Sequence, residues 1–135
     1  MKRFSISHEA GGDDQSAIMV AVAAAHEFSD EESIHDELGA RLAIVIEELV
    51  ANIVRHGASG ASVFIDGKME KVPNGVHLTL IDDGVHFNPK LALVDRSPNP
   101  ETGGGSGIPL VRAWADNLDY RCEGGLNWLE LYLRS

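Results

Sequence analysis

Residues 47–57 read Glu-Glu-Leu-Val-Ala-Asn-Ile-Val-Arg-His-Gly, and they end a long helical pattern. The pattern predicts a helix from about residue 33 to about residue 55. Glu48, Asn52 and His56 lie four residues apart within it, so they line one face of that helix. Glu48 and Asn52 each precede a member of an apolar stripe by one position, which puts them on the flank of the buried face. The apolar stripe consists of Leu38, Leu42, Val45, Leu49 and Ile53.

Glu48 and Asn52 suit one chemical task well. The amide oxygen of Asn52 can ligate Mg²⁺, a hard cation that takes oxygen ligands, and the carboxylate of Glu48 can hold or deprotonate a nucleophile beside it. Glu47 is the competing carboxylate, but it lies about 140° around the helix from Asn52. The spacing is common on helices, so the pair taken alone fits an ordinary polar flank more readily than a catalytic site.

The rest of the chain predicts helices and strands that do not alternate strictly. The predicted strands cover residues 3–7, 61–69, 76–82, 117–122 and 127–133. The other predicted helices cover residues 16–27 and 108–116. A polar connection of capping residues is expected at 29–32, and Pro73-Asn74-Gly75 and Gly124-Gly125 are expected to form hairpin turns. The order β-α-α-β-β-loop-α-β-β favours an α+β fold, a two-layer sandwich with helices on one face of a mixed, mostly antiparallel sheet.

The bulk composition indicates one compact domain over residues 1–135. The formal net charge is −10 and the pI is about 4.9, so the protein's own field would repel nucleic acids. ATP can still bind where backbone N–H groups and Mg²⁺ offset its phosphate charge. No apolar run approaches the roughly 20 residues of a membrane span, and the first residues lack the apolar core of a signal peptide. We therefore expect a cytoplasmic protein with no membrane and no direct nucleic-acid partner.

Cysteine and histidine usage excludes two further kinds of site. Cys122 is the only cysteine, so no internal disulfide can form, and we expect a buried, inert thiol within a strand. No pair among the histidines has the spacing of a zinc motif. His8, beside Glu9, is expected to be solvated.

A second motif stands at residues 82–89, which read Asp-Asp-Gly-Val-His-Phe-Asn-Pro. Asp82, at the end of a predicted strand, is well placed to accept a hydrogen bond from the exocyclic amine of adenine. Gly84 would let the backbone approach the flat base closely. Since Asp-Gly is a common turn pair, a simple strand-ending turn explains this motif, taken alone, more readily.

A third motif is the glycine cluster at residues 103–107, which leads into a predicted helix. Glycines permit positive φ and leave N–H groups free to point at phosphate oxygens, and the helix N-terminus adds a partial positive charge. The cluster is not a Walker A loop, because no Gly-Lys-Ser/Thr follows, and it does not follow a strand as a dinucleotide fingerprint does. A flexible linker is the alternative, but the cluster runs straight into an amphipathic helix.

The three motifs in this order resemble the GHKL ATPase superfamily, which contains gyrase, the heat-shock chaperone, histidine kinases and mismatch-repair ATPases. Residues 48–57 resemble its N box, 82–89 its first glycine box and 103–107 its second. More closely, the chain is similar to the anti-sigma factor serine kinases of bacterial partner-switching modules. Their signature is Glu-x-x-x-Asn-x-x-x-His, then Asp-x-Gly-x-x-Phe-Asp-Pro, then Gly-Gly-x-Gly-Leu. The resemblance extends from about residue 16 to the end and implies the GHKL, or Bergerat, ATP-binding fold.

The resemblance also implies a role for each matched residue. Glu48 would act as general base on a serine hydroxyl of a partner protein, and Asn52 would coordinate Mg²⁺ that bridges the ATP phosphates. Asp82 would bind the adenine amine, with Gly84 beneath the base. The other nucleotide-binding residues that it implies are His56, Phe87, Gly103, Gly104, Gly105, Ser106, Gly107 and Ile108. The N–H groups of residues 105 and 107 would bind the phosphates. His56 matches a family position, but a histidine that bonds nearby backbone at a helix end explains it more readily.

Three departures from the family pattern stand out. Asn88 replaces the usual aspartate, and Ile108 stands where leucine is usual, followed by Pro109. The start of the last helix is therefore expected to differ locally. The lid between residues 91 and 102 is short and contains Arg96 as its only cation, which would leave transition-state charge to Mg²⁺ and backbone N–H groups.

The function implied by the resemblance is that of an ATP- and Mg²⁺-dependent serine/threonine protein kinase acting as an anti-sigma regulatory factor. It would phosphorylate a serine of a small STAS-type anti-sigma factor antagonist and sequester a sigma factor or an equivalent regulator. Family members commonly dimerise, which implies a homodimer. Three alternatives stay open: a non-catalytic ATP-gated protein-binding module, an ATPase domain that hydrolyses ATP with water, and a structural domain whose glycines only form turns.

Overall fold

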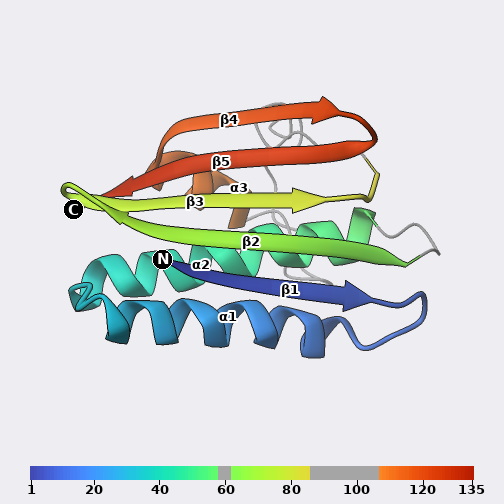
Figure 1. Ribbon diagram of the computed structural model, residues 1–135, viewed down its shortest axis with the longest axis horizontal. Coiled ribbons are helices and arrows are strands. Elements are labelled where there is room, and N and C mark those ends of the chain that lie inside the picture. Colours follow the sequence, from blue (N-terminus) through green and yellow to red (C-terminus); the bar gives the residue numbers. More distant parts are fainter. Residues whose placement is uncertain (58–61, 86–106) are drawn as a thin grey trace.

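The computed structural model describes residues 1–57, 62–85 and 107–135 (Figure 1). Five strands form one sheet in the order β1-β2-β3-β5-β4, and all neighbouring pairs are antiparallel. The strands are β1 (Lys2–His8), β2 (Val63–Val72), β3 (Gly75–Asp82), β4 (Ala115–Glu123) and β5 (Leu126–Arg134). The helices are α1 (Asp14–Glu31), α2 (Asp36–Asn52) and α3 (Gly107–Trp114), and a π-helical turn, η1 (Ile53–Gly57), extends α2. The predicted α+β fold and element order are confirmed, although the described strands pair only antiparallel instead of forming a mixed sheet.

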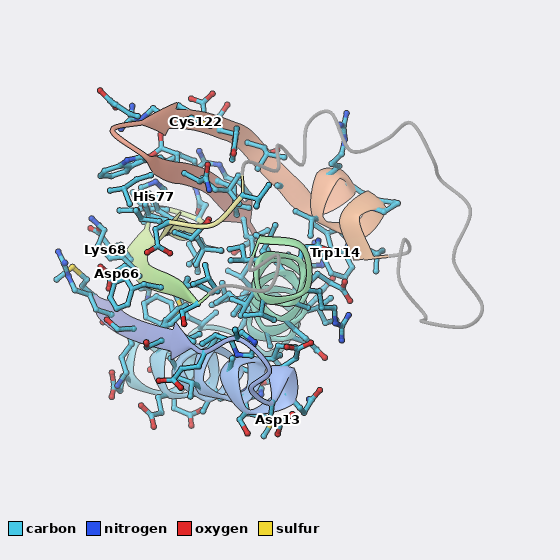
Figure 2. All side chains as sticks on the ribbon, turned by 90° about the vertical axis from the view of Figure 1, so that its right-hand side faces the viewer. Asp13, Asp66, Lys68, His77, Trp114 and Cys122 are labelled. Atoms are coloured by element: carbon cyan, nitrogen blue, oxygen red, sulfur yellow. The ribbon has the colours of Figure 1, made fainter. Side chains whose placement is uncertain are left out.

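The helices cover one face of the sheet and leave the other uncovered (Figure 2). Strands β2, β3 and β5 alternate buried and accessible side chains, as a half-buried sheet requires. Asp66, Lys68 and His77 lie on the face away from the helices (Figure 2). The largest fully buried side chains fill the layer between sheet and helices: Phe28, Leu42, Ile46, Ile65, Met69, Leu78, Leu80, Leu131 and Leu133.

Helix α2 packs its predicted apolar stripe into this core. Leu38, Leu42, Val45 and Leu49 are buried, and Ile53, in η1, is partly buried. The helix begins at Asp36 because His35 caps it, with the His35 Nδ1 accepting a hydrogen bond from the N–H of Leu38 at 3.3 Å. Glu48 and Asn52 are half-buried, as their place on the flank of the stripe predicts.

Helix α1 is longer than predicted at both ends. Asp13 caps it, since its side chain accepts from the N–H of Gln15 at 3.1 Å. The expected polar connection at residues 29–32 was wrong, because helix α1 runs on to Glu31. Phe28 in its last turn is fully buried, and that packing outweighs the weaker helix preference of the polar residues after it. No helix in the described ranges has both the length and the apolar character needed to cross a membrane.

Two single-residue expectations were also wrong. Cys122 is exposed, because it lies on the edge strand β4 next to the closing hairpin turn. His8 is buried, at 6% exposure, because it is the last inward-facing residue of β1. Its Nε2 lies 2.9 Å from an Asp14 carboxylate oxygen at the start of α1.

Candidate functional site

Three predicted site residues come from elements that end on the same side of the molecule. The C-terminal ends of α2 and β3 and the start of β5 all lie at the right of Figure 1. Glu48 and Asn52 stand in the last two turns of α2, and Asp82 is the last residue of β3. His56 lies in η1, and Gly107 and Ile108 open α3. The remaining predicted residues, Phe87, Gly103, Gly104, Gly105 and Ser106, lie outside the described residues.

The Glu48 carboxyl is held in an unusual electrostatic setting for a helix surface. Burial raises the pKa of Glu48 above its ordinary value, the negative charge of Glu47 raises it further, and the positive charge of Arg55 lowers it. Glu47 itself is exposed, although it is adjacent in sequence. Of these two carboxylates, Glu48 is the one that the fold partly removes from water.

The Asn52 side chain offers an uncommitted polar group one helical turn further on. Its amide nitrogen is buried and has no hydrogen-bond partner among the described residues. Buried polar groups are rarely left unpaired, and such a group calls for an explanation. A carboxamide carries an acceptor oxygen and a donor nitrogen on one carbon, so rotation by 180° exchanges the group that faces a bound molecule. Asn52 therefore fits a position reserved for a ligand.

Asp82 and Asp83, adjacent at the end of β3, have separate roles. Asp82 is buried, at 7% exposure, and its Oδ1 accepts the N–H of Gly84 at 2.9 Å. The Oδ1 of Asp83 instead accepts the N–H of Phe64 at 2.7 Å, which ties the end of β3 to β2. Because side chains alternate between the two faces of a strand, only one of two adjacent aspartates can face the helices. In the structure Asp82 is the one on the helix-covered side.

Asn127 is a site residue that sequence reasoning missed. It is buried, at 2% exposure, and its register partner across β3 and β5 is Asp82. Its Nδ2 donates to the Asp82 Oδ1 at 2.9 Å and to the Gly84 carbonyl oxygen at 3.0 Å. A signal existed: Asn127 is the polar first member of an inward-facing series that continues with Leu129, Leu131 and Leu133.

Tyr120 and Cys122, on β4, add to the hydrogen bonds around Asn127. The Tyr120 hydroxyl donates to the Asn127 Oδ1 at 2.9 Å. The Cys122 thiol lies 3.4 Å from the same oxygen and 3.3 Å from the Tyr120 hydroxyl. The Asp82–Gly84 turn is thus supported by side chains of the two strands that follow α3.

The family model for the histidine kinase-like ATPase domain matches residues 13–133. The chain belongs to the histidine kinase-like ATPase family. Membership implies ATP binding.

Two solved structures are similar to this histidine kinase-like ATPase. One is the histidine kinase domain of the blue-light activated histidine kinase from Erythrobacter litoralis EL346, at 14% identity and TM-score 0.52, covering 94% of this chain and 63% of that one. The other is a longer structure of that kinase, at 20% identity and TM-score 0.52, covering 73% of this chain and 30% of that one. At these identities the likeness shows the fold alone, and this chain spans less than two thirds of either neighbour. No match was found among curated proteins.

No group of three or more His, Cys, Asp or Glu side chains in residues 1–57, 62–85 and 107–135 could hold a metal ion. Mg²⁺ in nucleotide sites is commonly held by one or two protein oxygens together with substrate phosphates. The single carboxamide of Asn52 fits that pattern, in which the cation is bound with the nucleotide and not by a protein cage.

Proposed function

We propose that this chain is an ATP-dependent serine/threonine protein kinase of the anti-sigma type. One observation supports the proposal most strongly. A half-buried carboxylate with a raised pKa, Glu48, stands one helical turn from Asn52, whose buried amide nitrogen has no hydrogen-bond partner among the described residues. A general base and a cation ligand are two of the groups that phosphoryl transfer to a hydroxyl uses.

Nucleotide binding is proposed to rest on the ends of β3 and α2. The Asp82 carboxylate, oriented by Gly84 and Asn127, would accept a hydrogen bond from the exocyclic amine of adenine, and Gly84 would lie beneath the base. Asn52 would turn its oxygen toward Mg²⁺, which when bound would neutralise phosphate charge. The glycine cluster at residues 103–107 is proposed to surround the phosphates with N–H groups.

Glu48 is proposed to remove the hydroxyl proton of the serine that receives the phosphate. As the serine oxygen bonds to the γ-phosphorus and the bond from that phosphorus to the ADP oxygen breaks, the hydroxyl proton passes to the Glu48 carboxylate. Brønsted behaviour makes a carboxylate of raised pKa a stronger base than an ordinary one. A hydroxyl acceptor benefits from such a base because its proton must leave during the transfer.

The partners are proposed from the motif pattern. The phosphorylated serine would belong to a small STAS-type antagonist of an anti-sigma factor, and the chain would sequester a sigma factor or an equivalent regulator in the cytoplasm, as a homodimer. The solved neighbours are named as histidine kinases, so a histidine acceptor is the comparison that the assay should include.

ATP binding with Mg²⁺ present, measured by calorimetry, tests the proposal first. We expect saturable binding by the native chain and binding weakened at least about 10-fold in Asn52→Ala, since Mg²⁺ and its phosphate contacts lose their protein ligand. Asn74→Gly is the matched control. Asn74 has φ +61 in the β2–β3 turn at the opposite end of the molecule, where glycine is tolerated.

Transfer of labelled γ-phosphate to a candidate antagonist tests the second half. Acid-stable label on a serine would support the proposed serine kinase activity. Acid-labile label on a histidine would show a histidine kinase activity instead. ATP binding that changes the affinity for a partner while no label moves would replace the kinase with an ATP-gated binding module. Absence of ATP binding by the native chain would overturn the whole proposal.

A further inference from the structure

Tyr120, Asn127 and Asp82 form a continuous hydrogen-bonded chain across three strands. The Tyr120 hydroxyl on β4 donates to the Asn127 Oδ1 on β5 at 2.9 Å. The Asn127 Nδ2 then donates to the Asp82 Oδ1 at the end of β3, also at 2.9 Å. The same Nδ2 donates to the Gly84 carbonyl at 3.0 Å, so one amide holds both the carboxylate and the turn that follows it.

Only one orientation of the Asn127 amide satisfies these neighbours. The Asp82 carboxylate and the Gly84 carbonyl are acceptors and lie on one side, whereas the Tyr120 hydroxyl is a donor on the other. A flipped amide would turn its oxygen against two other oxygens, and water could not relieve this repulsion because Asn127 is only 2% exposed. The two acceptors therefore select the orientation in which Asn127 donates to Asp82, and the Tyr120 hydroxyl holds the amide oxygen in that orientation.

The orientation of Asn127 fixes the rotation of the Asp82 carboxylate. Two N–H groups, from Gly84 and Asn127, converge on the same oxygen, Oδ1, each at 2.9 Å. With Oδ1 held from two directions, the carboxylate plane has one preferred setting about its Cβ–Cγ bond. A carboxylate held in one setting offers a hydrogen-bond acceptor at one fixed place.

We infer that Tyr120 and Asn127 are positioning residues that set the choice between adenine and guanine in the nucleotide site. The inference rests on the proposed function, in which Asp82 binds the base. Adenine presents an amine donor at its six position, and guanine presents a carbonyl acceptor there. A fixed carboxylate repels the guanine oxygen, whereas a carboxylate free to rotate or to take up a proton tolerates it.

Asn127→Asp is the most informative variant because it replaces the amide NH₂ group by an oxygen and leaves the shape of the side chain almost unchanged. The donor that lies 2.9 Å from the Asp82 Oδ1 becomes a carboxylate oxygen. Two carboxylates at that distance cannot both be ionised, so the pair retains one shared proton. We expect this variant to bind ATP weakly at about pH 8 and more tightly at about pH 6, where the shared proton restores a donor. The native chain should show no such gain over that range.

The affinities for ATP and GTP are measured by calorimetry in the full chain. We expect the native chain to prefer ATP, Tyr120→Phe to lower the ATP-to-GTP affinity ratio about 3-fold, and Asn127→Ala to lower it about 10-fold or more. Tyr132→Phe is the matched control, because Tyr132 lies on the same sheet but on its uncovered face, stacked on His77. Its ratio should equal that of the native chain.

A second readout uses the protein without nucleotide. Hydrogen exchange at the Gly84 N–H should speed up in Asn127→Ala, because the carboxylate that accepts this N–H is then held by fewer groups. It should not change in Tyr132→Phe. Tyr120 is half-buried on an edge strand, so Tyr120→Phe keeps the fold even if Asn127→Ala does not.

The possible outcomes separate this inference from the proposed function. If the native chain binds no ATP, the proposed function fails and the inference falls with it. If the native chain binds ATP, but Tyr120→Phe and Asn127→Asp keep its base preference and its pH profile, the inference alone is overturned. A lowered base preference together with faster Gly84 exchange supports it.

Discussion

Glu47 and Glu48 are neighbours in sequence, but the helix gives their carboxylates different surroundings. Glu47 points to solvent, and Glu48 lies half-buried beside it with a raised pKa. A group whose pKa is raised by folding stabilises the fold only below its unfolded pKa, and this contribution is lost as the pH rises through the folded value. At neutral pH an ionised Glu48 is therefore a liability for stability, which is consistent with a residue retained for chemistry.

Replacing Glu48 by glutamine should separate chemistry from stability. We expect Glu48→Gln to lower phosphoryl transfer at least about 100-fold, because the base is lost, while ATP affinity stays within about 3-fold. The free energy of unfolding at pH 7 should rise by less than about 1 kcal/mol, because only a partly desolvated charge is removed. Transfer assays, calorimetry and thermal melting give the three values. Undiminished transfer would exclude Glu48 as the base.

The pH dependence of the phosphoryl-transfer rate should report the effect of neighbouring charges on the pKa of Glu48. Since burial and Glu47 raise the pKa of Glu48, the rate should fall on acidification at a pH above that of an ordinary glutamate. Glu47→Gln removes a like charge and should move this acid limb to lower pH, and Arg55→Gln should move it to higher pH. Initial rates from about pH 5 to about pH 8 test both signs. Equal profiles for the two variants would mean that another group controls the limb.

The sequence could predict Glu48, Asn52 and Asp82 as candidates because their signals are local. A helical period and a strand end each depend on a few adjacent residues. Asn127 and Tyr120 could not be found in this way. The bond from Asn127 to Asp82 spans 45 residues of sequence and exists only in one strand register. The exposure of Cys122 and the burial of His8 likewise depend on where their strands lie in the sheet.

At the scale of elements, α2 carries the proposed base and cation ligand, so its first turn matters to the site. His35 caps that turn, and its Nε2 also lies 3.2 Å from the hydroxyl of Ser135. Histidine is an uncommon cap, whereas Ser33, at the predicted start of the helix, is of a usual capping type. In the structure Ser33 has φ +53 and belongs to the link between α1 and α2.

Removing this cap should destabilise the helix that bears the site. We expect His35→Ala to lower the free energy of unfolding by about 1 kcal/mol, since the N–H of Leu38 loses its acceptor. Urea unfolding followed by tryptophan fluorescence measures the change. His26→Ala, an exposed histidine on α1, is the control and should fall within about 0.5 kcal/mol of the native chain. Equal losses in the two variants would argue against the cap.

The pairing of β1 with β2 depends on one glycine. Phe4 and Gly67 are register partners, and a Cβ added at Gly67 would overlap the Phe4 ring. We expect Gly67→Ala to cost about 1–3 kcal/mol through overpacking. In the double variant with Phe4→Leu, the added loss from Gly67→Ala should be smaller, because the shorter side chain leaves room for the methyl group. Additive losses in urea unfolding would show that the ring is not the obstacle.

For the whole molecule, the net charge of −10 acts on the fold as well as on its partners. The ion pairs of the described residues are mostly exposed at one or both ends, as with Lys2 to Glu27 and Arg41 to Glu37, and such pairs contribute little. Self-repulsion among the excess carboxylates is spread over the surface and is screened by salt.

Salt should therefore stabilise the protein. We expect the thermal midpoint to rise by a few degrees between about 10 mM and about 200 mM sodium chloride, as the Debye length falls from about 30 Å to below about 10 Å. Sucrose at matched osmolality controls for general solute effects. A midpoint that falls with salt would mean that the ion pairs outweigh the net repulsion.

The position of β5 in the sheet has a consequence for biosynthesis. It is the last strand of the described chain, yet it lies between β3 and β4, and through Asn127 it holds Asp82. A nascent chain that has emerged through β3 already contains Glu48, Asn52 and Asp82, but the carboxylate proposed to bind the base gains the support of Asn127 only when β5 leaves the ribosome. We expect stalled chains without β5 not to bind ATP. A prematurely terminated product that contains Glu48, Asn52 and Asp82 would therefore not compete with the finished protein for nucleotide.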